Sequence, residues 1–453
     1  MTPRESQHLY WRAGFGINPT ALKTLPKNRT QVVAKLFADS KVVTPISIDL
    51  SFMDGVTIRD IRDNPKFAQE LRVKSRKKLA VLNTAWINRL VLPKELLREK
   101  MTLFWANHFV CKDNHVVFAQ KFNNTLRIHA LGDFKTYVKA ISKEAAMLKY
   151  LNGKQNRKNQ PNENFARELM ELFTLGEGNY SEKDIKESAR AFTGYNHDFD
   201  GNFKIRVKQH DDGLKTFFGK TGNFSGDDII DIILKDKQCA TYISSKVYRY
   251  FVNPKPNKQR IDAMAEVFFK DYNIENLMRF VFMSDWFYDE ENIGAKIKSP
   301  IEYLVGIVNT VPVEFEREKD ILRIQKVLGQ TLLDPPNVAG WKGDKAWIDA
   351  NTIMVRLKLP SIMLNNAFIA SNENDEFRKQ FFKKKKGKFP FKTQPNWERF
   401  SENFKIVETD TLQNYMIQGP INDGTADYLE ILNKSSKQDY CIQLMSLPEY
   451  QMC

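Results

Sequence analysis

The sequence lacks every complete signature of a common catalytic or cofactor-binding motif. It has no GxxxxGK[ST] phosphate loop, no GxGxxG turn after a strand, no GxSxG nucleophile elbow and no HExxH zinc motif. Cysteine is scarce as well, and none of Cys111, Cys239, Cys441 and Cys453 is in CxxC spacing. These absences argue against the enzyme classes that the motifs define, against a zinc knuckle and against a disulfide framework.

Long apolar runs are also missing. No stretch approaches the ~18–20 residues needed to span a bilayer, and residues 1–16 lack the basic-then-apolar order of a signal peptide. As written, the chain is expected to be soluble and cytoplasmic, although a trimmed start leaves export open. The net charge of +14 comes from 69 Lys and Arg against 55 Asp and Glu in 453 residues. This surplus permits an acidic partner, nucleic acid or anionic lipid without requiring one.

Helical signals dominate, and convincing strand patterns are few. A proline at position 93 suits a first helical residue, and one apolar face follows it. That face consists of Leu97, Met101, Phe104, Trp105 and His108. Two Ser–Asp pairs predict capping boxes, Ser181 with Asp184 and Ser225 with Asp228. Asp133 predicts the N-cap of a further helix.

Further helices are expected at 161–176, 239–251, 259–269, 274–283, 300–310, 317–328 and 351–370. Together the patterns predict an all-α fold, an irregular orthogonal bundle of many helices with long ordered loops. At most a short β-hairpin is expected, near residues 201–209. The loop at 196–225 is long enough that it either binds something or is ordered by its own side chains.

Composition divides the chain into three parts. Residues 1–370 are expected to form one helical core unit. Residues 371–392 hold a run of lysines at 383–386 and 388, and blocks of like charge resist packing, so a basic linker or surface arm is expected there. Residues 393–453 are expected to be a C-terminal helical piece that packs back on the core.

An acid-rich segment at 161–176 holds the most unusual polar pattern. On a 3.6-residue wheel, Asn164, Glu168 and Glu171 flank an apolar stripe, and Glu163 and Arg167 form an i,i+4 pair. Two carboxylates three residues apart can share a hard cation, or a proton if they are buried. The Glu-x-x-His pattern of di-iron bundles fails here, because Glu171 stands in place of the histidine.

The same residues are also compatible with an ordinary salt-bridge network. Glu168 would then pair with Arg127 or Arg190 on another helix. His108 lies within an apolar face, where a packed core histidine with one hydrogen bond is the alternative to a site residue. His129 ends a helix, where a cation also favours the helix dipole. His210 opens the polar run HDDGLK, which either folds on itself or binds a ligand.

The candidate site is assembled from these residues. The candidate catalytic residues are Glu168, Glu171, His108, His129 and His210. The candidate ligand-binding residues are Asn162, Glu163, Asn164, Arg167, Arg127, Arg190, Thr193, Asp211 and Lys215. A divalent metal, if bound, is expected on Glu168, Glu171 and Asp211, because oxygen-rich clusters favour magnesium, calcium or manganese.

The chain resembles a bacterial family, domain of unknown function 1800, nearly from end to end. The segments that carry the resemblance are HLYWRAGFG (8–16), EKMTLFWANHF (99–109), LRIHALG (126–132), PNENFARELMELFTLG (161–176), ARAFTG (189–194), HDDGLKT (210–216), TGNFSGDD (221–228), PNVAGW (336–341) and LPEYQ (447–451). Relatives often have a second histidine where this chain has Ala106, so a paired-histidine ligand is not carried over. The resemblance implies a mostly helical fold, no established activity, and a partner from domain of unknown function 1501, a family that looks like sulfatases and alkaline phosphatases.

Three functions follow from these observations. The leading hypothesis is a binding or assembly protein with a polar carboxylate–histidine cleft, built from residues 108, 127–129, 162–175, 190–194 and 210–216. The alternative is a metal-dependent hydrolase that acts on phosphate or glycan substrates. The third is nucleic-acid binding through the basic tracts 72–78 and 383–388, which ranks last because no recognised nucleic-acid module is present.

Overall fold

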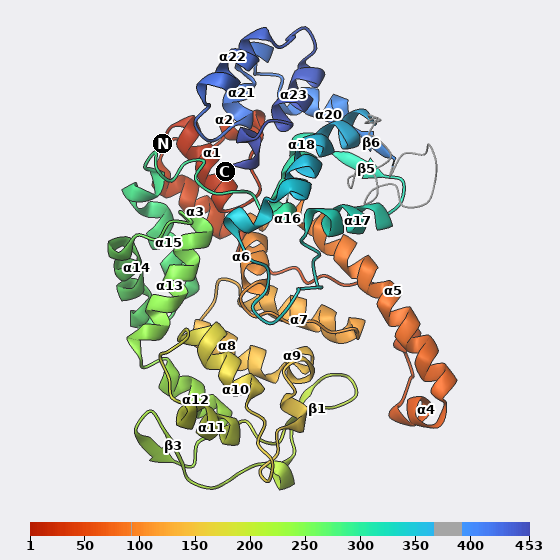
Figure 1. Ribbon diagram of the computed structural model, residues 1–453, viewed down its shortest axis with the longest axis vertical. Coiled ribbons are helices and arrows are strands. Elements are labelled where there is room, and N and C mark those ends of the chain that lie inside the picture. Colours follow the sequence, from red (N-terminus) through yellow and green to blue (C-terminus); the bar gives the residue numbers. More distant parts are fainter. Residues whose placement is uncertain (92, 367–391) are drawn as a thin grey trace.

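The computed structural model describes residues 1–91, 93–366 and 392–453. Most of these residues are helical, and the strands among them form short antiparallel pairs. The helices cross at many angles in an elongated body, and both chain ends lie in its upper half (Figure 1). The predicted mostly helical fold is confirmed. In the described parts of the chain, no helix is both long and apolar enough to cross a membrane.

The upper half in Figure 1 combines the start and the end of the chain. Its helices are α1 (Pro3–Arg12), α2 (Pro19–Lys23), α3 (Arg29–Asp39), α16 (Pro300–Thr310), α17 (Lys319–Leu328), α18 (Ala350–Asn365), α20 (Trp397–Asn403), α21 (Gln413–Met416), α22 (Asp423–Ile431) and α23 (Lys437–Met445). The long helix α5 (Pro65–Leu90) projects from this half and carries the short helix α4 (Ile58–Asp63) at its far end.

The middle and lower parts come from one continuous stretch of chain. The middle helices are α6 (Leu96–Ala106), α13 (Lys237–Phe251), α14 (Lys258–Asp271) and α15 (Ile274–Met283). The helices below them are α7 (Val116–His129), α8 (Phe134–Lys143), α9 (Ala145–Tyr150), α10 (Asn164–Glu168), α11 (Glu182–Ala191) and α12 (Gly226–Ile233). Short 3₁₀ turns connect several of these helices, and a π-helix at Leu169–Thr174 extends α10.

Helix starts follow the capping signals in the sequence. The capping boxes at Ser181 and Ser225 and the N-cap at Asp133 are all formed. Helices α15 and α16 occupy the predicted ranges, and α13, α14 and α17 lie close to theirs. Helix α6, however, begins at Leu96 rather than at the predicted proline, and its N-cap position has no side-chain hydrogen bond. The last residues of the helix predicted at 351–370 lie outside the described part of the chain.

Three pairs of short strands interrupt the helices, where the sequence predicted at most one hairpin. The pairs are β1 (Tyr195–His197) with β2 (Phe203–Ile205), β3 (Lys215–Phe217) with β4 (Lys220–Gly222), and β5 (Val313–Phe315) with β6 (Thr393–Pro395). The first pair lies near the predicted hairpin. The second turns at Phe218 and Gly219, both with positive φ, and a tight turn of this kind is normally signalled by Asn-Gly rather than Phe-Gly.

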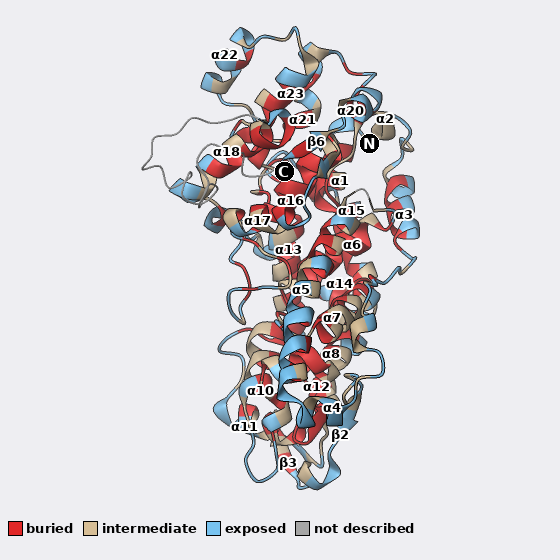
Figure 2. Ribbon diagram, turned by 90° about the vertical axis from the view of Figure 1, so that its right-hand side faces the viewer, coloured by how far each residue is buried: buried red, intermediate tan, exposed pale blue. Residues whose placement is uncertain are grey.

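Buried apolar side chains form two clusters, and buried residues occur along the whole length of the molecule (Figure 2). One is built mainly by α1, α3 and α6–α15. The other joins the inner part of α5 with α16–α18 and α20–α23, so helices on both sides of residues 367–391 share a core. The predicted division at residue 370 stays a prediction. Apart from Lys392, the predicted basic arm lies outside the described residues, as does the 383–388 tract.

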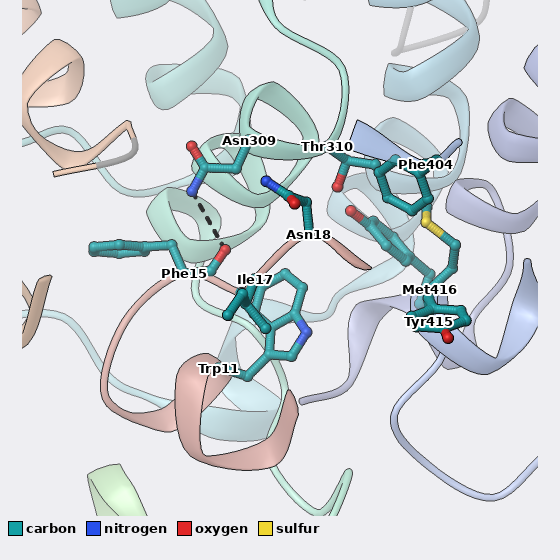
Figure 3. A pocket seen from close by; sticks show the side chains of 11 residues that line it. Trp11, Phe15, Ile17, Asn18, Asn309, Thr310, Phe404, Tyr415 and Met416 are labelled. Atoms are coloured by element: carbon teal, nitrogen blue, oxygen red, sulfur yellow. Dashed lines mark hydrogen bonds between the residues drawn. The ribbon is translucent and has the colours of Figure 1, made fainter. Parts of the chain in front are cut away.

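The first and last parts of the chain meet around Trp11 (Figure 3). A void of about 30 Å³, room for about one water, is lined by side chains that include Trp11, Asn18, Thr310, Phe404, Tyr415 and Met416. Nearby, Lys296 and Cys453 exchange backbone hydrogen bonds of 3.1 and 2.8 Å. The last residues are therefore paired with the segment that leads into α16.

Candidate functional site

The acid-rich segment is helical from Asn164 onward, first as α10 and then as the π-helix. Arg167 bonds both carboxylate oxygens of Glu182, at 2.9 and 3.0 Å, and one oxygen of Glu163 at 3.3 Å. The predicted pair of Glu163 and Arg167 is therefore confirmed. All three side chains are partly or largely exposed, so this network contributes little to stability.

Glu168 and Glu171 lie close enough to interact, as their spacing predicts. Partial burial, and then the charge of Glu171, raise the pKa of Glu168. One oxygen of Glu171 accepts a hydrogen bond of 2.8 Å from the Tyr180 hydroxyl. The salt bridge predicted from Glu168 to Arg127 or Arg190 is not formed among the described residues, because both arginines pair with other carboxylates.

The two predicted asparagines shape the turn into α10. Asn162 accepts a hydrogen bond from the Asn164 backbone at 3.1 Å, and its own backbone N–H donates to Asn156 at 2.9 Å. Asn156 in turn donates to the carbonyl of Ala189 on α11 at 2.8 Å. These amides therefore connect the start of the acid-rich segment to the neighbouring helix.

The predicted metal ligands are not gathered into one site. In residues 1–91, 93–366 and 392–453, no group of three or more His, Cys, Asp and Glu side chains is arranged to hold a metal ion. Asp211, the third predicted ligand, bonds Arg190 with both carboxylate oxygens, at 2.8 and 3.3 Å. Glu168 and Glu171 alone supply fewer protein ligands than a dedicated site usually has.

The polar run that begins at His210 folds on itself around α11. Arg190 bonds Asp211, and the Asp211 backbone N–H donates to the Thr193 hydroxyl at 2.8 Å. The buried Lys215 ammonium donates to the carbonyls of Asp211 and Gly213, at 2.6 and 3.0 Å. His210 Nδ1 lies 2.7 Å from the Thr193 carbonyl, to which it donates. Five predicted site residues are thus brought together, but in a closed network of mutual contacts.

Arg127 and His129 lie near each other on α7 but in different surroundings. Arg127 is fully buried and makes a bidentate pair with Glu99 of α6, at 2.6 and 3.1 Å. His129 is partly exposed and stacks on Tyr137 with ring centroids 5.4 Å apart, and burial lowers its pKa. No hydrogen bond or ion pair joins either of these described residues to the acid-rich segment.

His108 is buried at the end of α6, against the π-helix. Its Nε2 lies 3.0 Å from the carbonyl of Phe173 and must donate to it, which leaves Nδ1 unprotonated. Nδ1 faces the Lys246 ammonium at 3.4 Å. Burial, and then the charge of Lys246, hold the pKa of His108 well below its ordinary value. His108 is therefore a neutral imidazole of defined tautomer.

Helix α13 satisfies carbonyls at the end of the π-helix. Three side chains spaced four residues apart on α13 donate to it: Gln238 to the carbonyl of Leu175, and Tyr242 and Lys246 to that of Leu172, at 2.9, 3.2 and 3.0 Å. A π-helix displaces carbonyls from the usual ladder, and such turns often mark functional sites. This row fixes Lys246 beside His108.

A pocket of about 410 Å³ opens in front of His108 and Lys246. We call it the His108 pocket. Its other lining residues include Phe104, Tyr250 and Trp347, which give it aromatic walls, and Arg249, Lys296 and Asp344, which carry charge. Burial lowers the pKa of Lys246 to about 8. The Arg249 side chain makes no hydrogen bond or ion pair with a described residue.

The segment 337–341 closes over this pocket and is held by Asn107. The Asn107 side chain accepts from the Trp341 backbone N–H at 2.8 Å and donates to the Trp341 carbonyl at 3.1 Å. Gly340 has φ +80, and a Cβ there would lie 2.3 Å from the Asn107 oxygen. Glycine is required at this position both by the backbone conformation and by the close approach.

Of the residues that line the His108 pocket, the sequence pointed to one, His108 itself. Lys246, Arg249 and Trp347 were missed as site residues. The spacing of Gln238, Tyr242 and Lys246 was a usable signal, because three polar side chains in one row of a largely buried helix need partners.

A family model described as "Protein of unknown function (DUF1800)" matches residues 8–452. The chain belongs to this family. No curated protein and no solved structure matches the chain. Two of the segments that carry the likeness to domain of unknown function 1800 line the His108 pocket: 99–109, which supplies His108, and 336–341, which supplies Ala339. A third, 161–176, holds two lining residues in place, because the carbonyls of Phe173 and Leu172 accept hydrogen bonds from His108 and Lys246.

Proposed function

We propose that the protein is a binding protein that holds a compact organic anion in the His108 pocket. The observation that carries the proposal is that two separate family segments line one pocket, and a third holds its His108 and Lys246, while the pocket also contains Arg249, a cation without a partner among the described residues. A volume of about 410 Å³ lies within the range usual for small-molecule sites. The predicted class of function, a binding protein, is kept. The proposed site, however, lies at the C-terminal end of the π-helix rather than at the acidic side chains of the acid-rich segment.

The charges of the pocket favour an anion over a neutral ligand. Lys246, Arg249 and Lys296 are cationic, and Asp344 is the one acidic side chain among the described lining residues. Lys296 already bonds the buried Glu302 at 2.6 Å, which leaves Lys246 and Arg249 for a ligand. The aromatic rings of Phe104, Tyr250 and Trp347 suit an apolar body attached to the anionic group.

Calorimetric titration with 2-naphthoate, compared with the neutral 2-naphthalenemethanol, tests this proposal. We expect the carboxylate to bind and the alcohol, of the same ring size, to bind at least tenfold more weakly. Arg249→Gln should weaken the binding of naphthoate about fivefold, since Arg249 is exposed and a charge-assisted hydrogen bond at an exposed site contributes about 1 kcal/mol. Affinity should also fall as the pH rises through about 8, where Lys246 loses its proton.

Lys270→Gln is the matched control, because Lys270 is exposed on α14 and has no side-chain partner among the described residues. It should leave naphthoate binding unchanged. Equal affinity for the two naphthalene compounds would contradict the proposal, and so would an Arg249→Gln protein that binds naphthoate as the parent does.

Two further expectations remain proposals of the same kind. A partner from domain of unknown function 1501 is supported by the resemblance alone, and co-purification of the two proteins would test it. The cytoplasmic location is the other expectation, and cell fractionation would test it. No described feature favours the metal-dependent hydrolase over the binding protein.

A further inference from the structure

A second cleft, larger than the His108 pocket, was not predicted. It has a volume of about 1120 Å³. One wall is the face of α5 and α4 that carries Ile58, Leu71, Arg72 and Arg76, and the opposite wall is the β1–β2 hairpin with the residues after it. The loop between α6 and α7 forms the floor. We call this the α5 cleft.

Two contacts hold its walls and floor in place. The Ser75 hydroxyl of α5 donates to the carbonyl of Asn114 and accepts from the backbone N–H of Val116, both at 2.8 Å. On the hairpin side, Gly201 has φ +84 in the turn before β2, and a Cβ there would lie 2.8 Å from the Phe118 ring. The turn therefore packs directly on the floor of the cleft.

The floor is an aromatic stack with a buried carboxylate beside it. The Phe118 ring contacts the rings of His115 and His197, with centroids 4.1 and 5.0 Å away. The Lys149 ammonium lies over the same ring at 5.1 Å and bonds Asp113 Oδ1 at 2.6 Å. The Asp113 side chain is only 3% exposed.

Three buried polar atoms on this floor have no partner among the described residues. They are Asp113 Oδ2, His115 Nδ1 and His197 Nε2. His197 Nδ1 donates to the carbonyl of Asp198 at 2.6 Å, so its Nε2 carries no proton and is an acceptor. A buried acceptor without a donor is costly. Asp113 and His197 thus present acceptors that a ligand with hydroxyl groups would satisfy.

Cations surround these acceptors. Arg72, Arg76, Lys154 and Arg206 line the cleft, and none of their side chains pairs with a described carboxylate. Burial and then the charges of Arg206 and Lys149 lower the pKa of Lys154, which shows how closely the cations lie. Asp113 and Asp198 are the acidic lining residues in the described chain, and both already face a lysine.

We propose that the α5 cleft binds an acidic saccharide, a sugar that carries sulfate, phosphate or carboxylate groups. Its anionic groups would pair with Arg72, Arg76, Lys154 and Arg206. Its hydroxyl groups would donate to Asp113 Oδ2 and His197 Nε2, which a plain sulfate dianion cannot do because it has no donor. The α5 cleft is a different site from the His108 pocket, so the two proposals are tested independently.

The same features disfavour a nucleic-acid strand, although Arg72 and Arg76 belong to the basic tract 72–78. Sequence-independent strand binding depends on aromatic faces open for base stacking. The floor aromatic, Phe118, is only 5% exposed, and its ring is already contacted by two imidazoles and an ammonium group. A DNA strand also lacks free hydroxyl groups along its backbone.

Calorimetric titration of the full chain with four probes tests the proposal. A heparin-derived tetrasaccharide and glucose 6-phosphate represent a saccharide chain and a free sugar phosphate. Maltotetraose has hydroxyl groups without charge, and a single-stranded oligothymidylate has charge without hydroxyl groups. We expect at least one of the acidic sugars to bind at least tenfold more tightly than maltotetraose and the oligonucleotide. The stronger of the two identifies the source of the ligand.

Two sets of variants locate the binding. The double variant Arg72→Glu, Arg206→Glu should lower the affinity for the acidic sugar more than tenfold. The double variant Lys235→Glu, Lys270→Glu makes the same charge change on exposed lysines elsewhere and should lower this affinity less than threefold. Asp113→Asn replaces an acceptor with an amide and removes a negative charge. It should lower the affinity for the acidic sugar and at the same time raise the affinity for inorganic sulfate.

His197→Phe keeps the ring and removes the acceptor, and serves in place of Asp113→Asn if that variant does not fold. Equal binding of maltotetraose, or equal loss in the two charge-reversed pairs, would overturn the proposal. So would an oligonucleotide that binds as tightly as the sugars, or an Asp113→Asn protein whose sulfate and sugar affinities change together.

Discussion

The connection between α11 and α12 contains two hairpins of similar composition that end up in opposite states. The second, from His210 to Asn223, is closed, because Arg190, Lys215 and Thr193 satisfy one another and the backbone around them. The first, β1–β2 with the residue after it, presents His197 Nε2 and the Arg206 side chain to the α5 cleft, and neither has a hydrogen-bond partner in the described chain. Polar residues in a loop are thus equally compatible with a structural network and with a binding wall.

What decides between the two states is the helix opposite each hairpin. The second hairpin packs on α11, whose Glu187 and Arg190 complement its charges: Glu187 accepts from the Thr216 backbone at 2.7 Å, and Arg190 bonds Asp211. The first hairpin faces α5, whose Arg72 and Arg76 repeat its positive charge instead of balancing it. Like charges across a cleft are unfavourable unless an anion lies between them.

The closed network should be the more sensitive of the two to truncation. Arg190→Ala leaves Asp211 and Glu187, 16% and 17% exposed, without their cation. We expect the free energy of unfolding to fall by about 2 kcal/mol, because losing one partner of a largely buried pair leaves the other charge uncompensated. Urea denaturation measures this, and hydrogen exchange should show faster exchange at 211–223.

Arg206→Ala is the matched change in the open hairpin and should alter the free energy of unfolding by less than about 0.5 kcal/mol. If both arginines proved equally costly to remove, the distinction between a closed network and an open wall would fail.

A smaller loss in the free energy of unfolding is expected at Lys215, which donates hydrogen bonds within the closed loop. Lys215→Met removes hydrogen bonds to the carbonyls of Asp211 and Gly213 but also removes a buried charge. The two contributions partly offset, so we expect a loss of about 1 kcal/mol in the free energy of unfolding. Lys204 in β2 lies 3.5 Å from Asp198, and 64% of its side chain is exposed. Lys204→Met should therefore change the free energy of unfolding little.

The sequence predicted helices and caps well because those signals are local. Ser181, Ser225 and Asp133 cap the helices that they were expected to cap, and a capping box needs only residues three apart. The pairing of Glu163 with Arg167 was predictable for the same reason. The pairings of Arg127 with Glu99 and of Arg190 with Asp211 were not, since they depend on which segments of the chain are neighbours in space.

The sites were harder to predict than the helices, and for a physical reason. Charge density along the chain drew attention to the acid-rich segment and the HDDGLK run, where many of the charges are satisfied by near neighbours. The α5 cleft takes Asp113 and His115 from the loop between α6 and α7, His197 from β1 and Arg72 from α5, so no short window of sequence contains it. The π-helix was missed too, because its carbonyls are stabilised by α13, about 70 residues further along the chain.

A further effect is expected in the pH dependence of the stability, and it belongs to the open hairpin. Burial lowers the pKa of His197 from its ordinary 6.5, so between the folded and unfolded pKa values the unfolded chain binds more protons than the folded one. His197 therefore contributes stability that is present above pH 6.5 and is lost as the pH falls below it. The slope of the free energy of unfolding against pH is at most about 1.4 kcal/mol per pH unit, the value for one bound proton.

In His197→Phe the acid limb of the stability curve should be flatter by up to that amount between pH 6.5 and 5, measured by urea denaturation at each pH. Other histidines titrate in both proteins, so the difference between the two curves isolates His197. Parallel curves would mean that His197 is as free to take up a proton in the folded protein as in the unfolded chain, and that the α5 cleft does not hold it as a neutral acceptor.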